Sequence, residues 1–144
     1  MKTSFWTHRP LAAVAATGLL LSLAGCQNLL GSQKPVDEVF EAALSTSGER
    51  MEDGSFVRIH TVTVPKGHHV SATLVSDHFD TYLLAIPPDG SQQRENDDCD
   101  MTDSAKGSCL DFIAHVGGKW QFVANSYTAD ESGVYRMTVQ SVKP

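Results

Sequence analysis

The sequence predicts an all-β fold, an antiparallel sandwich or barrel, for most of its 144 residues. From Phe56 onward, short segments of alternating apolar and polar residues are separated by turn residues at intervals of roughly ten. These segments are rich in β-branched residues, and none of them has the apolar spacing of a helix. A chain of this length suits one globular domain.

The expected strands are bounded by proline and glycine residues, which end or turn a strand. They are 56–64, 69–75, 80–86, 109–116, 119–125 and 133–142. Within 69–75, Val70, Ala72 and Leu74 fall on one face, as expected for a half-buried strand. The dipeptide Gly117-Gly118 predicts a two-residue hairpin between 109–116 and 119–125.

Segment 35–44 is compatible with two structures. Its apolar residues follow helical spacing, and Pro35 is allowed in a first helical turn. An isolated helix this short is marginal without packing. We expect a strand, which the family resemblance described below also favours.

Residues 1–25 have the three parts of an export signal: basic residues near the start, an apolar run over 11–23, and small residues at the end. The run is shorter than the ~20 residues that span a bilayer. It ends in Leu23-Ala24-Gly25-Cys26, which resembles the cleavage box of bacterial lipoproteins. That resemblance implies lipidation of Cys26, including palmitate. Cleavage by an ordinary signal peptidase, which would leave Cys26 free, is the alternative.

The expected organisation is a lipoprotein signal peptide at 1–25, a lipidated cysteine and tether at 26–34, and a sandwich domain at 35–144. Gln27 is not the aspartate that marks inner-membrane retention in Gram-negative lipoproteins, so the outer membrane is the expected location, on either its periplasmic or its surface side. The formal net charge of −6, without any Lys/Arg cluster, argues against a nucleic-acid partner. The lipid on Cys26 is the expected membrane contact.

The chain has three cysteines, an odd number for an exported protein. Lipidation of Cys26 would use one of them. Cys99 and Cys109 are then expected to form a disulfide, which an oxidising export compartment permits. Nothing near them has the ligand spacing of a zinc site.

One stretch of sequence resembles the bacterial pre-peptidase C-terminal domain. The most specific match is Ser76-Asp77-His78-Phe79-Asp80-Thr81-Tyr82-Leu83 followed by Asn96-Asp97, with turn motifs Val64-Pro65-Lys66-Gly67 and Pro88-Asp89-Gly90 in the same order. The resemblance implies a compact, jelly-roll-like antiparallel sandwich without catalytic residues. Some members of that family bind calcium and extracellular polymers. The resemblance gives Phe79, Asp80, Thr81, Tyr82, Leu83 and Asn96 a structural role, with Asp80 accepting backbone N–H bonds from the loop that follows Asn96 rather than acting in catalysis.

The loop 95–103 is dense in carboxylates, which suit a hard cation such as calcium. The residues expected to bind such an ion are Asp97, Asp98 and Asp100, together with Asp77. Their spacing is not that of an EF-hand. We expect this loop to be a solvated acidic hairpin without an ion, and the calcium site is the alternative.

The histidines and aromatic residues give weaker indications of a site. A zinc site among the histidines His60, His68, His69, His78 and His115 is not expected, since neighbours in a strand such as His68 and His69 point to opposite faces. Trp120, Tyr82 and Phe122 would form either a sugar-stacking platform or part of the core.

The function expected from these observations is that of a lipid-anchored, non-enzymatic envelope protein that presents a binding surface to a protein or polymer. A calcium-stabilised structural or adhesion module is the alternative. A hydrolase is a remote third possibility, because no Gly-x-Ser-x-Gly motif supports one.

Overall fold

A computed structural model describes residues 35–100 and 106–144. The expected signal peptide, Cys26 and the tether lie outside the described residues, as do residues 101–105 of the acidic loop. Within the described ranges, no helix is long and apolar enough to cross a bilayer.

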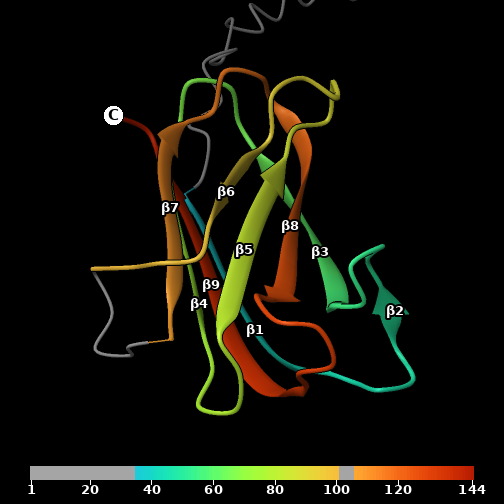
Figure 1. Ribbon diagram of the computed structural model, residues 1–144. Coiled ribbons are helices and arrows are strands. Elements are labelled where there is room, and N and C mark those ends of the chain that lie inside the picture. Colours follow the sequence, from blue (N-terminus) through green and yellow to red (C-terminus); the bar gives the residue numbers. More distant parts are fainter. Residues whose placement is uncertain (1–34, 101–105) are drawn as a thin grey trace, which may run out of the picture. The chain divides into compact units, whose positions relative to one another are not determined.

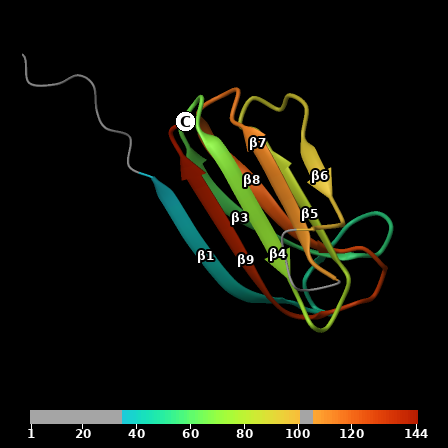
Figure 2. The same ribbon diagram turned by 90° about the vertical axis from the view of Figure 1, so that its left-hand side faces the viewer.

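Two antiparallel β-sheets pack face to face (Figures 1 and 2). One has four strands in the order β1-β9-β4-β7, and the other has five in the order β2-β3-β8-β5-β6. Their bounds are β1 Val36–Leu44, β2 Glu49–Arg50, β3 Phe56–Val64, β4 His69–Val75, β5 Thr81–Ile86, β6 Arg94–Asn96, β7 Ser108–Ile113, β8 Gly118–Ser126 and β9 Gly133–Val142. The predicted all-β sandwich is confirmed, and without the short β2 it has the eight strands in two sheets of a jelly roll.

The core lies between the sheets and is built by period-two alternation. Val70, Ala72 and Leu74 of β4 are fully buried, as the sequence predicts. The largest fully buried side chains are aromatic: Trp120, Phe56, Phe79 and Phe122. Trp120 packs on Phe112 with the ring centroids 5.2 Å apart, so the opposed faces of β7 and β8 meet across the core.

Segment 35–44 is the strand β1, not a helix. It pairs antiparallel with β9 from Val36 opposite Ser141 to Leu44 opposite Gly133. Phe40 and Ala42 of β1 pack against the core. Pairing with a strand almost a hundred residues later supplies the packing that the isolated segment lacks.

The predicted hairpin at Gly117-Gly118 is wrong. β7 pairs with β4 and β8 pairs with β3 and β5, so the two strands lie in different sheets. The glycines make the sharp crossing between sheets possible: a Cβ on Gly117 would lie 2.9 Å from the backbone nitrogen of Lys66, and Gly118 has a φ of 140°. The alternation of apolar and polar residues in the two strands does not distinguish a hairpin from a crossing between sheets, because the same side chains face the core in both arrangements.

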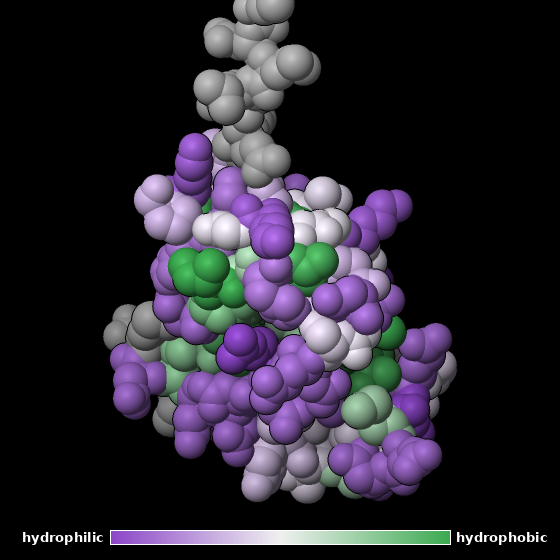
Figure 3. Space-filling view, turned by 90° about the horizontal axis from the view of Figure 1, so that it is seen from above, coloured by the Kyte–Doolittle hydropathy of each residue, from purple (hydrophilic) through white to green (hydrophobic). Residues whose placement is uncertain are grey.

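The chain enters and leaves the sandwich at one end. Val36 begins β1 beside Ser141, near the end of β9, and β1 runs away from this end to Leu44. Figure 3 looks onto this end from above and shows a mostly hydrophilic surface with isolated hydrophobic residues. The start of β3, the end of β8 and the start of β5 lie at the opposite end.

Candidate functional site

A groove of about 360 Å³ lies on the outer face of the five-stranded sheet, at the end remote from Val36. We call it the tyrosine groove. Its principal lining residues are Met51, Asp53, Tyr82, Glu95, Asn125 and Tyr127. Tyr82 and Asn125 are directly opposite each other on β5 and β8. Their chain neighbours Leu83 and Ala124 are fully buried in the core, so alternation directs Tyr82 and Asn125 outward.

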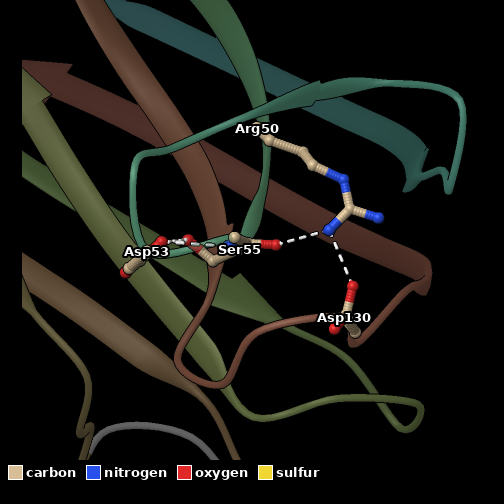
Figure 4. Close-up of polar contacts among 5 residues, drawn as sticks. Arg50, Asp53, Ser55 and Asp130 are labelled. Carbon is tan, nitrogen blue, oxygen red and sulfur yellow. Dashed lines mark hydrogen bonds and ion pairs between the residues drawn. The ribbon is translucent and has the colours of Figure 1, made fainter.

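The loop between β2 and β3 forms one wall of the groove and is held by polar contacts of Arg50 and Asp53 (Figure 4). Arg50 donates to the carbonyl oxygen of Gly54 at 2.9 Å and forms an ion pair with Asp130 at 2.7 Å. Asp53 Oδ1 accepts from the backbone N–H and the hydroxyl of Ser55, at 2.9 and 2.6 Å. The Ser55 hydroxyl, followed by its backbone N–H, lowers the pKa of Asp53, so this carboxylate stays ionised.

The groove combines the aromatic rings of two tyrosines with negatively charged carboxylates. Their ring centroids are 6.4 Å apart and their planes are inclined by 52°. Tyr127 is 57% exposed, whereas Tyr82 is half-buried. Burial, followed by the negative charges of Glu95 and Asp97, raises the pKa of Tyr82, so its hydroxyl stays protonated.

Asn125 is the unusual polar residue of the groove. It is only 4% exposed, yet its Oδ1 atom has no hydrogen-bond partner among the described residues. The hydroxyl of Ser126, which also lines the groove, is likewise buried without a partner. Buried polar atoms are nearly always hydrogen-bonded, so an unpaired one beside a groove indicates a place for a ligand donor.

A second groove, of about 490 Å³, lies on the outer face of the four-stranded sheet. Two of its polar contacts are internal: Arg136 lies 3.8 Å from Glu41, and the Ser76 hydroxyl donates to the carbonyl of Val134 at 2.8 Å. Asp77 and His78 also line it. Among the described residues that line this groove, no buried side-chain polar atom lacks a hydrogen-bond partner, which distinguishes it from the tyrosine groove.

The residues of the motif that resembles the pre-peptidase C-terminal domain lie partly in the core and partly on the surface. Phe79 and Leu83 are fully buried, and Phe79 packs edge-on against Tyr135 with centroids 6.3 Å apart. The Thr81 hydroxyl donates to the carbonyl of Lys106 at 2.8 Å and contacts the Ser108 hydroxyl, tying β5 to the start of β7. Tyr82 turns outward into the tyrosine groove, and Asp77 and His78 of the motif are exposed.

Asp80 is half-buried at the start of β5. Its N–H donates to the Glu131 carboxylate at 3.3 Å, and its carbonyl accepts from the N–H of Tyr127 at 2.8 Å. The expected partners of its carboxylate lie in the acidic loop, part of which is outside the described residues. The acceptor role of that carboxylate stays a prediction.

Cys99 and Cys109 form a disulfide with their Cα atoms 5.1 Å apart, as expected. Asn96 braces this region: its Nδ2 donates to the carbonyl of Asp98 at 2.6 Å and to the carbonyl of Cys109 at 3.0 Å. The side chain of Asn96 therefore joins the first turn of the acidic loop to β7.

The expected calcium ligands are not brought together in the part of the chain that the structure describes. Over 35–100 and 106–144, no three His, Cys, Asp or Glu side chains are placed to hold a metal ion. Asp77 lines the groove on the four-stranded sheet, whereas Asp97, Asp98 and Asp100 belong to the loop after β6. Since residues 101–105 lie outside the described ranges, calcium binding by this loop stays a prediction.

The histidines serve separate contacts. His60 Nε2 lies 2.7 Å from the Tyr135 hydroxyl. Burial, followed by the positive charge of Arg58, lowers the pKa of His60. Burial also raises the pKa of Tyr135 to about 12. His68 is buried and bonds Ser141, and His69 faces outward to Asp111 at 2.7 Å. The expected opposite directions of His68 and His69 are confirmed.

The sequence pattern missed Asn125 and Tyr127 as site residues. A sugar-stacking platform of Trp120, Tyr82 and Phe122 does not form, because Trp120 and Phe122 are fully buried. The available signal was the polar Asn125 directly after the apolar run Phe122-Val123-Ala124 of β8.

Comparison with known proteins adds no assignment: no family model and no curated protein matches the chain. The resemblance to the pre-peptidase C-terminal domain therefore stays a prediction based on the motifs.

Proposed function

We propose that this chain is a lipid-anchored, non-enzymatic module of the bacterial outer membrane that binds a protein or polymer partner of the cell envelope through the tyrosine groove. The observation that carries the proposal is the buried, unpartnered Oδ1 of Asn125 beside two tyrosine rings. Large, partly apolar side chains with a polar tip, such as tyrosine, contribute strongly to binding surfaces.

The position of the groove supports this role. The described chain begins at the end of the sandwich where Val36 pairs with Ser141, and the groove lies at the other end, where Asn125 pairs with Val57. A lipid on Cys26, upstream of that first end, would leave the groove on the side of the domain that is remote from the anchor. A partner could then reach it without competing with the bilayer surface.

Replacing Tyr127 by alanine tests the binding role. Because a tyrosine anchor contributes about 2 kcal/mol or more to an interface, its loss should weaken partner retention by about 30-fold. The measurement is quantitative capture from envelope extracts on the immobilised full-length protein, comparing wild type with Tyr127→Ala. Tyr127 is 57% exposed, so the variant is expected to fold normally.

The matched control is Ile113→Ala, which removes a side chain of similar exposure, 50%, from the outer face of the other sheet. It should retain the partner as wild type does. A partner that is retained equally by Tyr127→Ala, or no partner above background with wild type, would overturn the proposal.

A further inference from the structure

We propose that the tyrosine groove receives an arginine side chain of a protein partner. This inference rests on the proposed function and specifies the chemistry of the ligand. It is carried by three properties of the groove: an unpaired acceptor, an excess of carboxylates, and two aromatic rings, one exposed and one half-buried.

The unpaired acceptor requires a ligand that donates. The Oδ1 atom of Asn125 is a carbonyl oxygen, which can only accept a hydrogen bond. It is buried without a partner among the described residues, and the side chain lines the groove. A guanidinium group has five N–H donors and no acceptor, so it fits this requirement.

The charge of the groove selects a cation. Asp53 and Glu95 line it, and none of the described lining residues is basic. One oxygen of each is already used within the protein: Asp53 Oδ1 accepts from Ser55, and Glu95 Oε2 accepts from Gln93 Nε2 at 2.9 Å. Glu95 also interacts with the hydroxyl of Tyr82, and both carboxylates contribute negative charge to the groove. An anion would be repelled, and a neutral ligand would cover these charges without compensating them.

The rings favour arginine among cations. Tyr82 and Tyr127 present neighbouring faces, 6.4 Å between centroids, and aromatic faces attract a cation within about 6 Å. A planar guanidinium stacks on such a ring and still donates in its own plane, whereas an ammonium group is a compact and strongly hydrated charge. An arginine can therefore contact a ring, Asn125 and a carboxylate at once.

The test uses the peptide acetyl-Gly-Gly-Arg-Gly-Gly-amide and its citrulline counterpart, which has nearly the same shape but no charge. Binding is followed by NMR chemical-shift titration of the full-length protein in detergent micelles. We expect the arginine peptide to shift the amide signals of Tyr82, Asn125 and Tyr127, with a Kd roughly tenfold or more below that of the citrulline peptide. The affinity should fall as salt is raised, because salt screens the carboxylates.

Variants locate the interaction. Glu95→Gln and Asn125→Leu should each weaken binding of the arginine peptide several-fold, whereas Glu38→Gln, an exposed carboxylate on β1, should leave it unchanged. Equal affinity for arginine and citrulline peptides, or the same loss with Glu38→Gln as with Glu95→Gln, would overturn the inference. A neutral oligosaccharide that shifts the groove amides when the arginine peptide does not would overturn it as well.

The outcome is separable from that of the proposed function. If the arginine peptide fails but Tyr127→Ala still abolishes capture of the envelope partner, the groove binds a partner of different chemistry and only this inference falls. If capture is independent of Tyr127, the proposed function falls.

Discussion

Replacing Trp120 by alanine is expected to lower the free energy of unfolding by about 3–5 kcal/mol. Trp120 is fully buried, contacts Phe112, and donates from Nε1 to the carbonyl of Val116 at 3.1 Å. Its removal leaves a large cavity between the sheets and an unpaired carbonyl at the crossing from β7 to β8. Urea unfolding of the full chain, followed by circular dichroism, measures the loss.

Two further variants bracket this result. Trp120→Phe keeps most of the ring volume and should cost less than the alanine variant, so it provides a measurable value if Trp120→Ala does not fold. Ile59→Ala, at a side chain that is 47% exposed on β3, should change stability by less than ~1 kcal/mol. A cost for Trp120→Ala no greater than that for Ile59→Ala would contradict the packing of the core.

Removal of the Cys99–Cys109 disulfide is expected to lower stability by about 2–3 kcal/mol. The bond joins residues separated by 10 positions, and closing a loop of this size reduces the entropy of the unfolded chain. The double variant Cys99→Ser/Cys109→Ser should unfold at a midpoint lower by roughly 10 °C, as measured by thermal unfolding.

Reduction of the wild-type protein serves as the independent comparison. A reductant should shift the wild type to about the midpoint of the double variant and leave the double variant unmoved. An unchanged wild-type midpoint would show that the loop is already restrained without the bond, for example by the contacts of Asn96 with Asp98 and Cys109.

Alternation predicts the strands well because it reports which residues face the core. The expected bounds 56–64, 69–75 and 133–142 coincide with β3, β4 and β9. Alternation does not indicate which strand pairs with which, and the prediction of a hairpin at Gly117-Gly118 was therefore wrong. β2 and β6 have two and three residues, too few for a period to be visible.

The groove was harder to predict because it is assembled from separate strands and a loop. Tyr82 lies within a motif whose other members are structural, and its outward direction follows only once Thr81 and Leu83 are placed in the core. Asn125 becomes informative through an unpaired oxygen, which depends on its neighbours in three dimensions. The disulfide was predictable, since the expected lipidation of Cys26 left one pair among the three cysteines.

The pairing of the first strand with the last determines how the domain would respond to mechanical load. Nine residue pairs join β1 and β9, from Val36 with Ser141 at one end to Leu44 with Gly133 at the other. Pulling on both chain ends would open these pairs one after another, like a zipper. A membrane anchor before β1 and a partner held in the tyrosine groove would instead pull β1 lengthwise, which loads its hydrogen bonds to β9 together. With the proposed anchor and partner, the domain would resist tension along the direction in which the partner applies it.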